Sequence, residues 1–190
     1  MAAWKDERDL RIAWESRATA TGLEVGIEII DPEAPIRVGD IEIEPVLVDH
    51  QPVEPAYGFV FRANGKTAVI SGDTAVCPAL IEAGQGCDLL VHEVLIHGAM
   101  RATPGQRTKA TVDNVAQYHT LSTEVGGVAR DMGAKALALT HFVPPEVDRE
   151  GLLAEVGKTY DGPVFVGEDG MGFHLSTGDV AHGSFRARVI

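Results

Sequence analysis

Two short, continuous apolar runs constrain the fold of this chain more than any other feature. They are DLLVHE, which spans residues 88–93, and AKALALTH, which ends at His141. Such runs are typical of strands that are covered on both faces. A helical pattern over Ser122–Met132 separates them and ends at Gly133. Strands that alternate with helices predict a sheet with crossover connections.

The earlier part of the chain instead alternates apolar and polar residues with a period of two, which is typical of half-buried strands. Leu23–Ile30 and Ile41–Val48 show this pattern and predict a hairpin or meander. Tyr57–Ala63 and Thr67–Ser71 flank an Asn-Gly turn, which favours a tight hairpin. The two halves together predict an α/β fold with a mixed β-sheet and flanking helices.

Further elements are predicted around this sheet. An amphipathic helix is expected from Trp4 to about Thr19, a short one over Pro78–Ala83 and another within Glu146–Val156. The segment PVFVGEDGMGFHL is expected to supply the closing strands. Gly98–Asn114 is polar and locally basic, as a surface loop would be.

Composition narrows the classes of protein that fit. A length of 190 residues with 45% hydrophobic residues predicts one compact domain over residues 1–190. A net charge of −12 opposes a grip on phosphate backbones, so a nucleic-acid partner is not expected. No apolar run approaches the ~20 residues of a membrane-spanning helix. With two cysteines and no secretory signal pattern, a cytoplasmic location is expected.

Polar residues stand where four predicted strands end: His50, Asp73, Glu93 and His141. In sheets flanked by helices, residues at this edge line the crevice where ligands bind. Histidine and carboxylate together suit zinc, manganese or iron. Taken singly, each residue also fits a structural role, because an aspartate can cap a helix and a histidine can bond to the backbone.

Five segments resemble, in this order, the metallo-β-lactamase superfamily. They are DHQPVEPAYGFVF, AVISGDT, DLLVHEV, YHTLSTEVGGVARDMGAKALALTHFVPP and GPVFVGEDGM. Within the superfamily they are most similar to the branch of the transfer-RNA processing nuclease RNase Z and its arylsulfatase-like and phosphodiesterase-like relatives. The resemblance runs from about Ile36 to Met171 and implies the C-terminal part of an αββα sandwich.

The resemblance implies a role for each of five residues. His50 resembles a ligand of the first metal, Asp73 the carboxylate that bridges both metals, and His141 a ligand of the second. Glu93 and His119 resemble the pair that delivers a proton to the leaving group. Complete sites of the family hold two metal ions, so Zn²⁺ or Mn²⁺ is the implied cofactor.

The other histidines are expected outside the site. His92 precedes Glu93 in a strand and should face the opposite side, which indicates a structural role. His97 is at most a loop candidate. Close strand packing is expected at Tyr57 and Gly58. Surface or turn positions are expected for His174, His182 and Asp169.

One family element is absent from this sequence. The His-x-His-x-Asp-His motif does not occur, and no histidine precedes His50. Three ligands are too few for two metal ions, because each catalytic zinc usually has three protein ligands of its own. Half a sandwich would also leave an apolar sheet face exposed. We therefore expect a homodimer or a companion N-terminal half.

Three functions stay open. The first is a metal-dependent hydrolase that cleaves a small phosphodiester or sulfate ester through metal-bound hydroxide and is incomplete as this chain alone. The second is a catalytically inactive, metal-poor binding or assembly module of the same fold. The third is an active enzyme with a different ligand set, built from His50, Asp73, His119 and His141. A β-lactam or lactone is a further option, because the same chemistry acts on carbonyls.

Overall fold

The computed structural model describes residues 2–14, 26–27, 29–32 and 34–190. The chain divides into two compact units, Met1–Ile30 and Asp31–Ile190. The first unit contains helix α1 (Ala2–Trp14). The helix predicted from Trp4 is therefore present as far as Trp14, and the rest of that prediction lies outside the described residues. No helix in the described ranges is long and apolar enough to cross a membrane.

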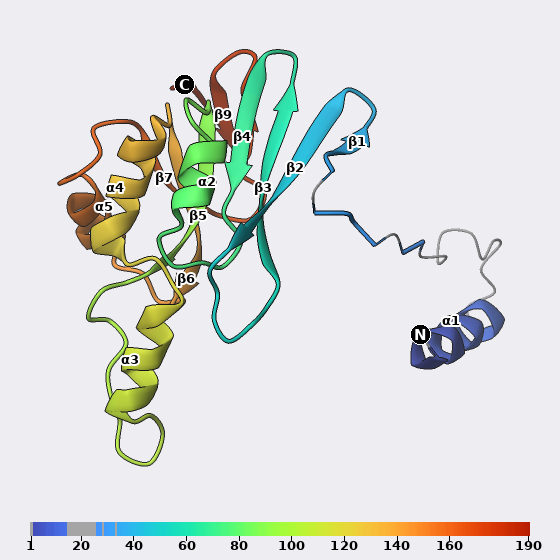
Figure 1. Cartoon of the computed structure of the whole chain (residues 1–190), viewed down its shortest axis with the longest axis horizontal. Helices are drawn as coiled ribbons and strands as arrows, with labels where there is room; N and C mark the ends of the chain where they lie inside the picture. Colours follow the sequence, from blue (N-terminus) through green and yellow to red (C-terminus); the bar gives the residue numbers. More distant parts are fainter. Residues whose placement is uncertain (1, 15–25, 28, 33) are drawn as a thin grey trace. The chain divides into compact units, whose positions relative to one another are not determined.

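The second unit is built on a seven-stranded sheet with the strand order β1 to β7 (Figure 1). Strands β1 to β4 are antiparallel to their neighbours, whereas β4 to β7 run parallel. This confirms the predicted mixed sheet. The strands are β1 (Ile36–Val38), β2 (Ile41–Val48), β3 (Ala56–Ala63), β4 (Lys66–Ile70), β5 (Leu89–Leu95), β6 (Leu137–Val143) and β7 (Val164–Val166).

The Asn-Gly hairpin is confirmed between β3 and β4, where Asn64 and Gly65 both have positive φ. The strand predicted over Leu23–Ile30 is wrong wherever the structure describes it, because residues 26, 27, 29 and 30 have no regular structure. Ile27 is 66% and Ile29 96% exposed, so the alternation there buries no face. Strand β2 pairs with β1 and β3 instead.

Four helices of this unit are α2 (Pro78–Ala83), α3 (Lys109–Gln117), α4 (Ser122–Met132) and α5 (Arg149–Val156). The predictions for α2 and α4 match the observed bounds. The loop predicted over Gly98–Asn114 is wrong over residues 109–114, which form the start of α3. The Thr108 side chain begins that helix by accepting a hydrogen bond from the backbone N–H of Thr111.

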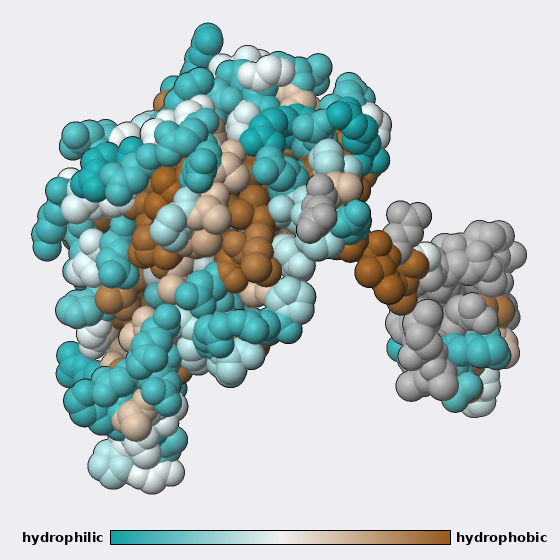
Figure 2. All heavy atoms as spheres, viewed as in Figure 1, coloured by the Kyte–Doolittle hydropathy of each residue, from teal (hydrophilic) through white to brown (hydrophobic). Residues whose placement is uncertain are grey.

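One face of the sheet packs against α2 and α4. Leu80 of α2 and Met132 of α4 belong to the same buried cluster as Val69 and Leu90 of the sheet. Burial of this cluster supplies the main hydrophobic stabilisation of the unit. Figure 2 shows hydrophobic residues also reaching the surface in the middle of this unit, within a largely hydrophilic outline.

The other face is covered in part by a small antiparallel sheet of β8 (Gly172–His174), β9 (Asp179–His182) and β10 (Phe185–Arg188). Side chains from this region and from the chain end pack on β5 and β6. The cluster contains Leu89, Ala136 and Ala138, with Phe173, Leu175 and Ile190 against it.

Apolar residues of β2 and β4 stay exposed on that second face. Val69 belongs to the core on the helix side of the sheet, so its neighbour Ile70 points to the other face. Pro45 and Phe59 lie opposite Ile70 in the strand register and share that face. Leu47 follows in alternation and is 61% exposed, while Ile70 is 41% exposed. This part of the sheet therefore presents apolar side chains to the solvent.

Candidate active site

Polar side chains gather where the strands of the large sheet end. Strands β2, β4, β5 and β6 run in the same direction, so their carboxyl ends lie at one edge. His50 follows β2, Asp73 follows β4, and Glu93 and His141 lie near the ends of β5 and β6. His119 joins them from the segment between α3 and α4. The predicted strand-end cluster is therefore present.

A glycine turn positions Asp73. Gly72 has φ of +62°, and a Cβ atom there would lie 2.5 Å from the carbonyl oxygen of Tyr57. Any other residue would combine a steric clash with an unfavourable backbone conformation. The Ser-Gly-Asp sequence thus turns sharply out of β4 and presents the aspartate at the sheet edge.

His141 lies within β6 rather than after it, and it forms a bulge. Glu93 pairs with Thr140 and Val94 with Phe142, so His141 is the extra residue of β6. Its φ is +42°, which is uncommon for a residue other than glycine. Bulges next to functional sites re-aim a side chain, and this one places the imidazole beside Asp73.

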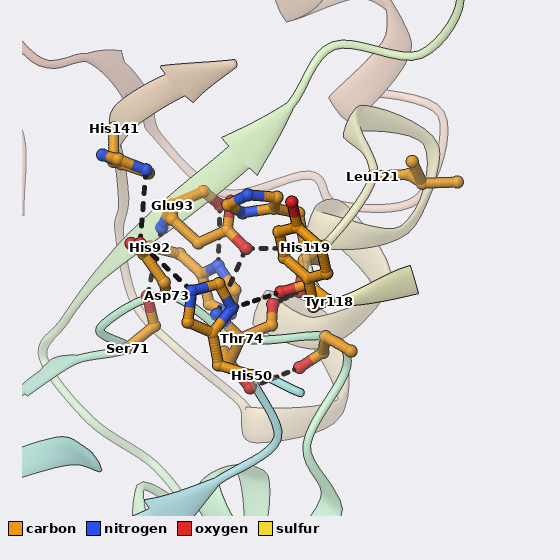
Figure 3. A network of polar contacts seen from close by, with 12 residues as sticks. His50, Ser71, Asp73, Thr74, His92, Glu93, Tyr118, His119, Leu121 and His141 are labelled. Carbon is orange, nitrogen blue, oxygen red and sulfur yellow. Dashed lines mark hydrogen bonds and ion pairs between the residues drawn. The ribbon is translucent and has the colours of Figure 1, made fainter. Parts of the chain in front are cut away.

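The Asp73 carboxylate lies between two imidazoles (Figure 3). Its Oδ2 atom is 3.7 Å from Nε2 of His50 and 3.4 Å from Nε2 of His141. The Nδ1 atom of His50 is 3.1 Å from the backbone oxygen of Tyr118, to which it donates when neutral. Nε2 of neutral His50 then carries a lone pair directed toward a carboxylate oxygen.

This arrangement suits a cation. The Nε2 lone pair of His50 and the Asp73 carboxylate are both electron-pair donors, so they need a metal ion or a proton between them. The Tyr118 carbonyl that holds the other ring nitrogen of His50 is the usual support of a metal-binding histidine. Histidine and carboxylate are also the donor types that zinc and manganese accept. Among the described residues, no group of three His, Cys, Asp or Glu side chains is placed to hold one ion. The donors therefore fit the implied metals in type, and fall short in number.

Glu93 and His119 form a buried pair beside this cluster. Oε2 of Glu93 is 3.2 Å from Nδ1 of His119, and the side chains are 1% and 7% exposed. The contact does not meet the geometry of a hydrogen bond, and both atoms lack another partner within the described residues. Buried polar atoms without a partner are rare and need an explanation, and a functional role is one.

The imidazole of His119 lies close to the rings of both His50 and His141. Its centre is 5.4 Å from that of His50 and 5.8 Å from that of His141. The ring of Tyr118 packs against both His50 and His119, with centres 5.0 and 4.9 Å apart. The structure thus brings all five predicted site residues together, and their roles in binding and catalysis stay predictions.

The other histidines do not join the site. His92 is buried on the opposite side of β5, and its Nδ1 is 2.8 Å from the backbone oxygen of Glu93. Burial lowers the pKa of His92, which fits the structural role predicted for it. His97 and His174 are exposed, and His182 is 3.9 Å from Glu168.

Three residues that the sequence did not single out also build the site. Tyr118 orients His50 through its backbone oxygen, while Thr74 and Thr120 donate their backbone N–H groups to Glu93. They lie in the AVISGDT and YHTLST segments, but the resemblance assigned them no role. The one available signal is position, because each threonine directly follows a candidate site residue.

A cavity of about 350 Å³ adjoins the site at His141. Its lining combines apolar side chains with two carboxylates. The lining includes Ala138, Phe142, Glu168, Asp169, Met171 and Phe173. Asp169 lies in a turn, as predicted.

A match to a protein-family model shows which family the chain belongs to. A model described as the beta-lactamase superfamily domain matches residues 8–142, which is well over half of the chain. The chain belongs to the metallo-β-lactamase superfamily. Members of this superfamily usually bind metal ions such as zinc.

Individual relatives agree with this superfamily placement. A putative ribonuclease Z of Mycobacterium tuberculosis (strain CDC 1551 / Oshkosh) is 32% identical over 123 residues, which cover 64% of this chain and 53% of the relative. A ribonuclease Z of Mycobacterium marinum is 38% identical over 96 residues, covering 50% of this chain and 33% of the relative. The chain therefore spans about half the length, or less, of these superfamily relatives.

Solved structures of the superfamily support the same fold. The metallo-beta-lactamase fold protein YhfI from Bacillus subtilis has a TM-score of 0.59 and 23% identity, over 74% of this chain and 52% of its own. A putative metal-dependent hydrolase from Parabacteroides distasonis has a TM-score of 0.52 and 15% identity, over 76% and 58%. The predicted α/β class and its relation to the metallo-β-lactamase sandwich are thus confirmed.

Proposed function

We propose that this chain is the C-terminal part of a metal-dependent hydrolase that cleaves a small phosphodiester or sulfate ester. The observation that carries the proposal is the position of Asp73 Oδ2 between Nε2 of His50 and Nε2 of His141, beside the buried Glu93–His119 pair. A metal-ligand pair next to a proton-transfer pair is what hydrolysis of such an ester requires.

Each residue has a distinct task in this proposal. His50 and His141 would each hold one metal ion, and Asp73 would be shared by both. When bound, the metal ions would act as Lewis acids on the ester and lower the pKa of the attacking water. His119 would hold a proton for the leaving-group oxygen, and Glu93 would orient its ring and stabilise the protonated form.

The relatives and the charge of the chain guide the choice of substrate. Relatives called ribonuclease Z support a phosphodiester. A net charge of −12 disfavours a long polyanion, which supports a small molecule over RNA. A sulfate ester fits the same chemistry, because its oxygens are clamped in the same way.

We infer that a second polypeptide segment completes the site. With Asp73 shared, this chain offers each metal one histidine and one carboxylate, and a catalytic zinc usually needs three protein ligands. The exposed Leu47 and Ile70 offer such a segment an apolar face. A companion N-terminal half would also account for the part of the relatives' length that this chain does not span; a second copy is the other occupant that the test separates.

A binding or assembly module with little metal is the second candidate. It is favoured by the lack, among described residues, of three side chains placed around one ion. In that case the site residues would hold the sheet edge together without turnover.

Metal content and mass in solution test the proposal together. Purified chain is analysed for bound metal before and after incubation with zinc or manganese, alone and with the companion segment, with Asp73→Ala and the off-site His97→Ala as matched variants. About two metals per functional unit, lost in Asp73→Ala and kept in His97→Ala, supports the hydrolase and justifies a screen with phosphate and sulfate esters. If the metal-bound species formed by this chain alone has the mass of two copies, a second copy completes the site; if metal binds only with the companion present, the companion completes it. Absence of metal at every concentration, alone and with the companion, overturns it in favour of the binding module.

A further inference from the structure

We propose that Thr74 and Thr120 act as a positioning pair that fixes the Glu93 carboxylate and so directs it toward His119. The inference deepens the proposed function and depends on it only for the kinetic part of the test. The geometric part stands on contacts within this chain.

The carboxylate of Glu93 is held from one side. Its Oε1 accepts the backbone N–H of Thr120 at 2.8 Å and that of Thr74 at 3.3 Å. Its own backbone N–H donates to the hydroxyl of Ser71 at 3.1 Å. With Oε1 occupied by two donors, Oε2 is the atom left to face His119. The orientation of the proton-transfer pair therefore depends on where the two threonine N–H groups lie.

A side-chain hydrogen bond ties those two donors together. The hydroxyl of Thr120 donates to the backbone oxygen of Thr74 at 2.8 Å, and both threonines are fully buried. Thr120 immediately follows His119, and Thr74 immediately follows Asp73. The bond thus links the segment that carries the proton-transfer histidine to the segment that carries the candidate metal bridge.

Thr74 extends the link to the end of β2. Its hydroxyl accepts the backbone N–H of Asp49 at 3.2 Å, and the backbone N–H of Ala75 donates to the oxygen of Asp49 at 2.8 Å. Asp49 directly precedes His50. Three segments that are distant in sequence are therefore held at fixed spacing through one buried residue.

Loss of the Thr120 hydroxyl should loosen this arrangement. Thr120→Val fills nearly the same volume but leaves the buried backbone oxygen of Thr74 without a donor. Leaving one partner unsatisfied destabilises a protein more than removing both partners of the hydrogen bond. The Thr74 segment would shift, and its N–H would move away from Oε1. A purely structural hydroxyl would lower stability without changing the contact between Thr74 and Glu93.

Nuclear magnetic resonance of the chain measures that contact directly. An amide proton bonded to a carboxylate resonates downfield, so Glu93→Gln should move the amide protons of residues 74 and 120 upfield. We expect Thr120→Val to move the Thr74 amide proton in the same direction, Thr120→Ser to restore it, and Thr159→Val to leave it unchanged. Thr159 is a matched control because its hydroxyl bonds to the Val156 carbonyl of the α5 segment and touches none of the site residues.

The kinetic part uses the active assembly. There, kcat of Thr120→Val should fall by about ten- to a hundredfold, as for a displaced catalytic group, with metal affinity unchanged within about twofold. A folded Thr120→Val with an unmoved Thr74 amide, or with full kcat, overturns the positioning role. If Thr120→Val does not fold, unmoved amides in Glu93→Gln overturn it. An inactive wild type refutes the proposed function alone, because the amide shifts still decide the geometry.

Discussion

Nδ1 of His119 lies 3.2 Å from Oε2 of Glu93, and the two atoms face each other at a buried position with no hydrogen bond between them. The distance between the two atoms is within the range of a hydrogen bond, which fits the proton-transfer role proposed for the pair. The neighbouring Asp73 carboxylate instead faces two imidazole nitrogens, one of His50 after β2 and one of His141 in β6. The two carboxylates at this edge of the sheet thus have different environments, which is consistent with the different tasks proposed for them.

Replacing His119 should affect turnover far more than metal binding. In an active assembly, His119→Ala removes the proton donor, and general acid catalysis contributes on the order of 10²–10⁴ in rate. His119 has no contact with Asp73 among the polar contacts of the site, so the metals should stay bound. Steady-state kinetics and elemental analysis of the same preparation check this.

His97→Ala is the control for that experiment, because the side chain is exposed and outside the cluster. It should retain both rate and metal. Equal loss of rate and metal in His119→Ala would contradict the division of roles and favour the ligand set that includes His119.

The shared carboxylate predicts a difference in metal stoichiometry. Asp73→Ala should remove both metals from the completed site, because Oδ2 faces both histidines. His50→Ala and His141→Ala should each lose one equivalent and keep most of the other. Titration with zinc, followed by elemental analysis, measures this. Retention of one full equivalent by Asp73→Ala would show that the carboxylate is not shared.

The sequence predicted those parts of the fold whose signals are local. The helix Ser122–Met132 was found because periodicity and a following glycine mark it, and the Asn-Gly hairpin because that turn selects its own geometry. Leu23–Ile30 failed where it is described, since alternation makes a strand only if a neighbour buries one face. The start of α3 was missed because the segment is polar and the helix buries no residue, so its capping threonine, Thr108, was the signal to follow.

The site shows the same division. Strand ends and motif resemblance identified the five side chains that meet at the sheet edge. The bulge at His141 was not predictable, because it arises from a register shift between β5 and β6. Thr74 and Thr120 were missed because they contact Glu93 through backbone N–H groups, and their hydroxyls bond to backbone atoms of segments distant in sequence, which no local sequence pattern reports.

Asp88 predicts a pH-dependent contribution to stability far from the site. Burial raises the pKa of its carboxyl, but hydrogen bonds from Lys135, the Thr67 backbone and Lys66 outweigh it, and the pKa lies below its usual value. A lowered folded-state pKa gives stability that is present above about pH 4, the pKa of an unfolded aspartate, and is lost as pH falls through the folded-state pKa.

Asp88→Asn should therefore lower the free energy of unfolding by roughly 1–3 kcal/mol at pH 7, and the difference from wild type should shrink below about pH 4. Urea denaturation at both pH values measures it. Asp113→Asn is the control, since its contact with Lys109 is exposed and should contribute little. A difference that is constant with pH would contradict the ionic origin.

Two neighbouring glycines of α4 should respond to alanine with opposite signs. A Cβ atom on Gly126 would lie 2.4 Å from the Thr159 hydroxyl and 2.6 Å from the Val156 carbonyl oxygen, so helix α4 could not keep its distance from the α5 segment. On Gly127 the nearest atom would be 3.8 Å away, at the end of the Arg130 side chain. Gly126→Ala should destabilise by about 1–3 kcal/mol through overpacking.

Gly127→Ala should stabilise by about 0.5–1 kcal/mol, because alanine loses less backbone entropy in a helix. The pair shares one helix and one substitution, so helix propensity cancels in the difference between the two variants, and that difference reports packing. Chemical denaturation of both variants measures it. If Gly126→Ala were as stable as Gly127→Ala, α4 would not pack tightly on the α5 segment at Gly126. The Ser122–Glu155 hydrogen bond at the start of α4 would then be the contact that links the two helices.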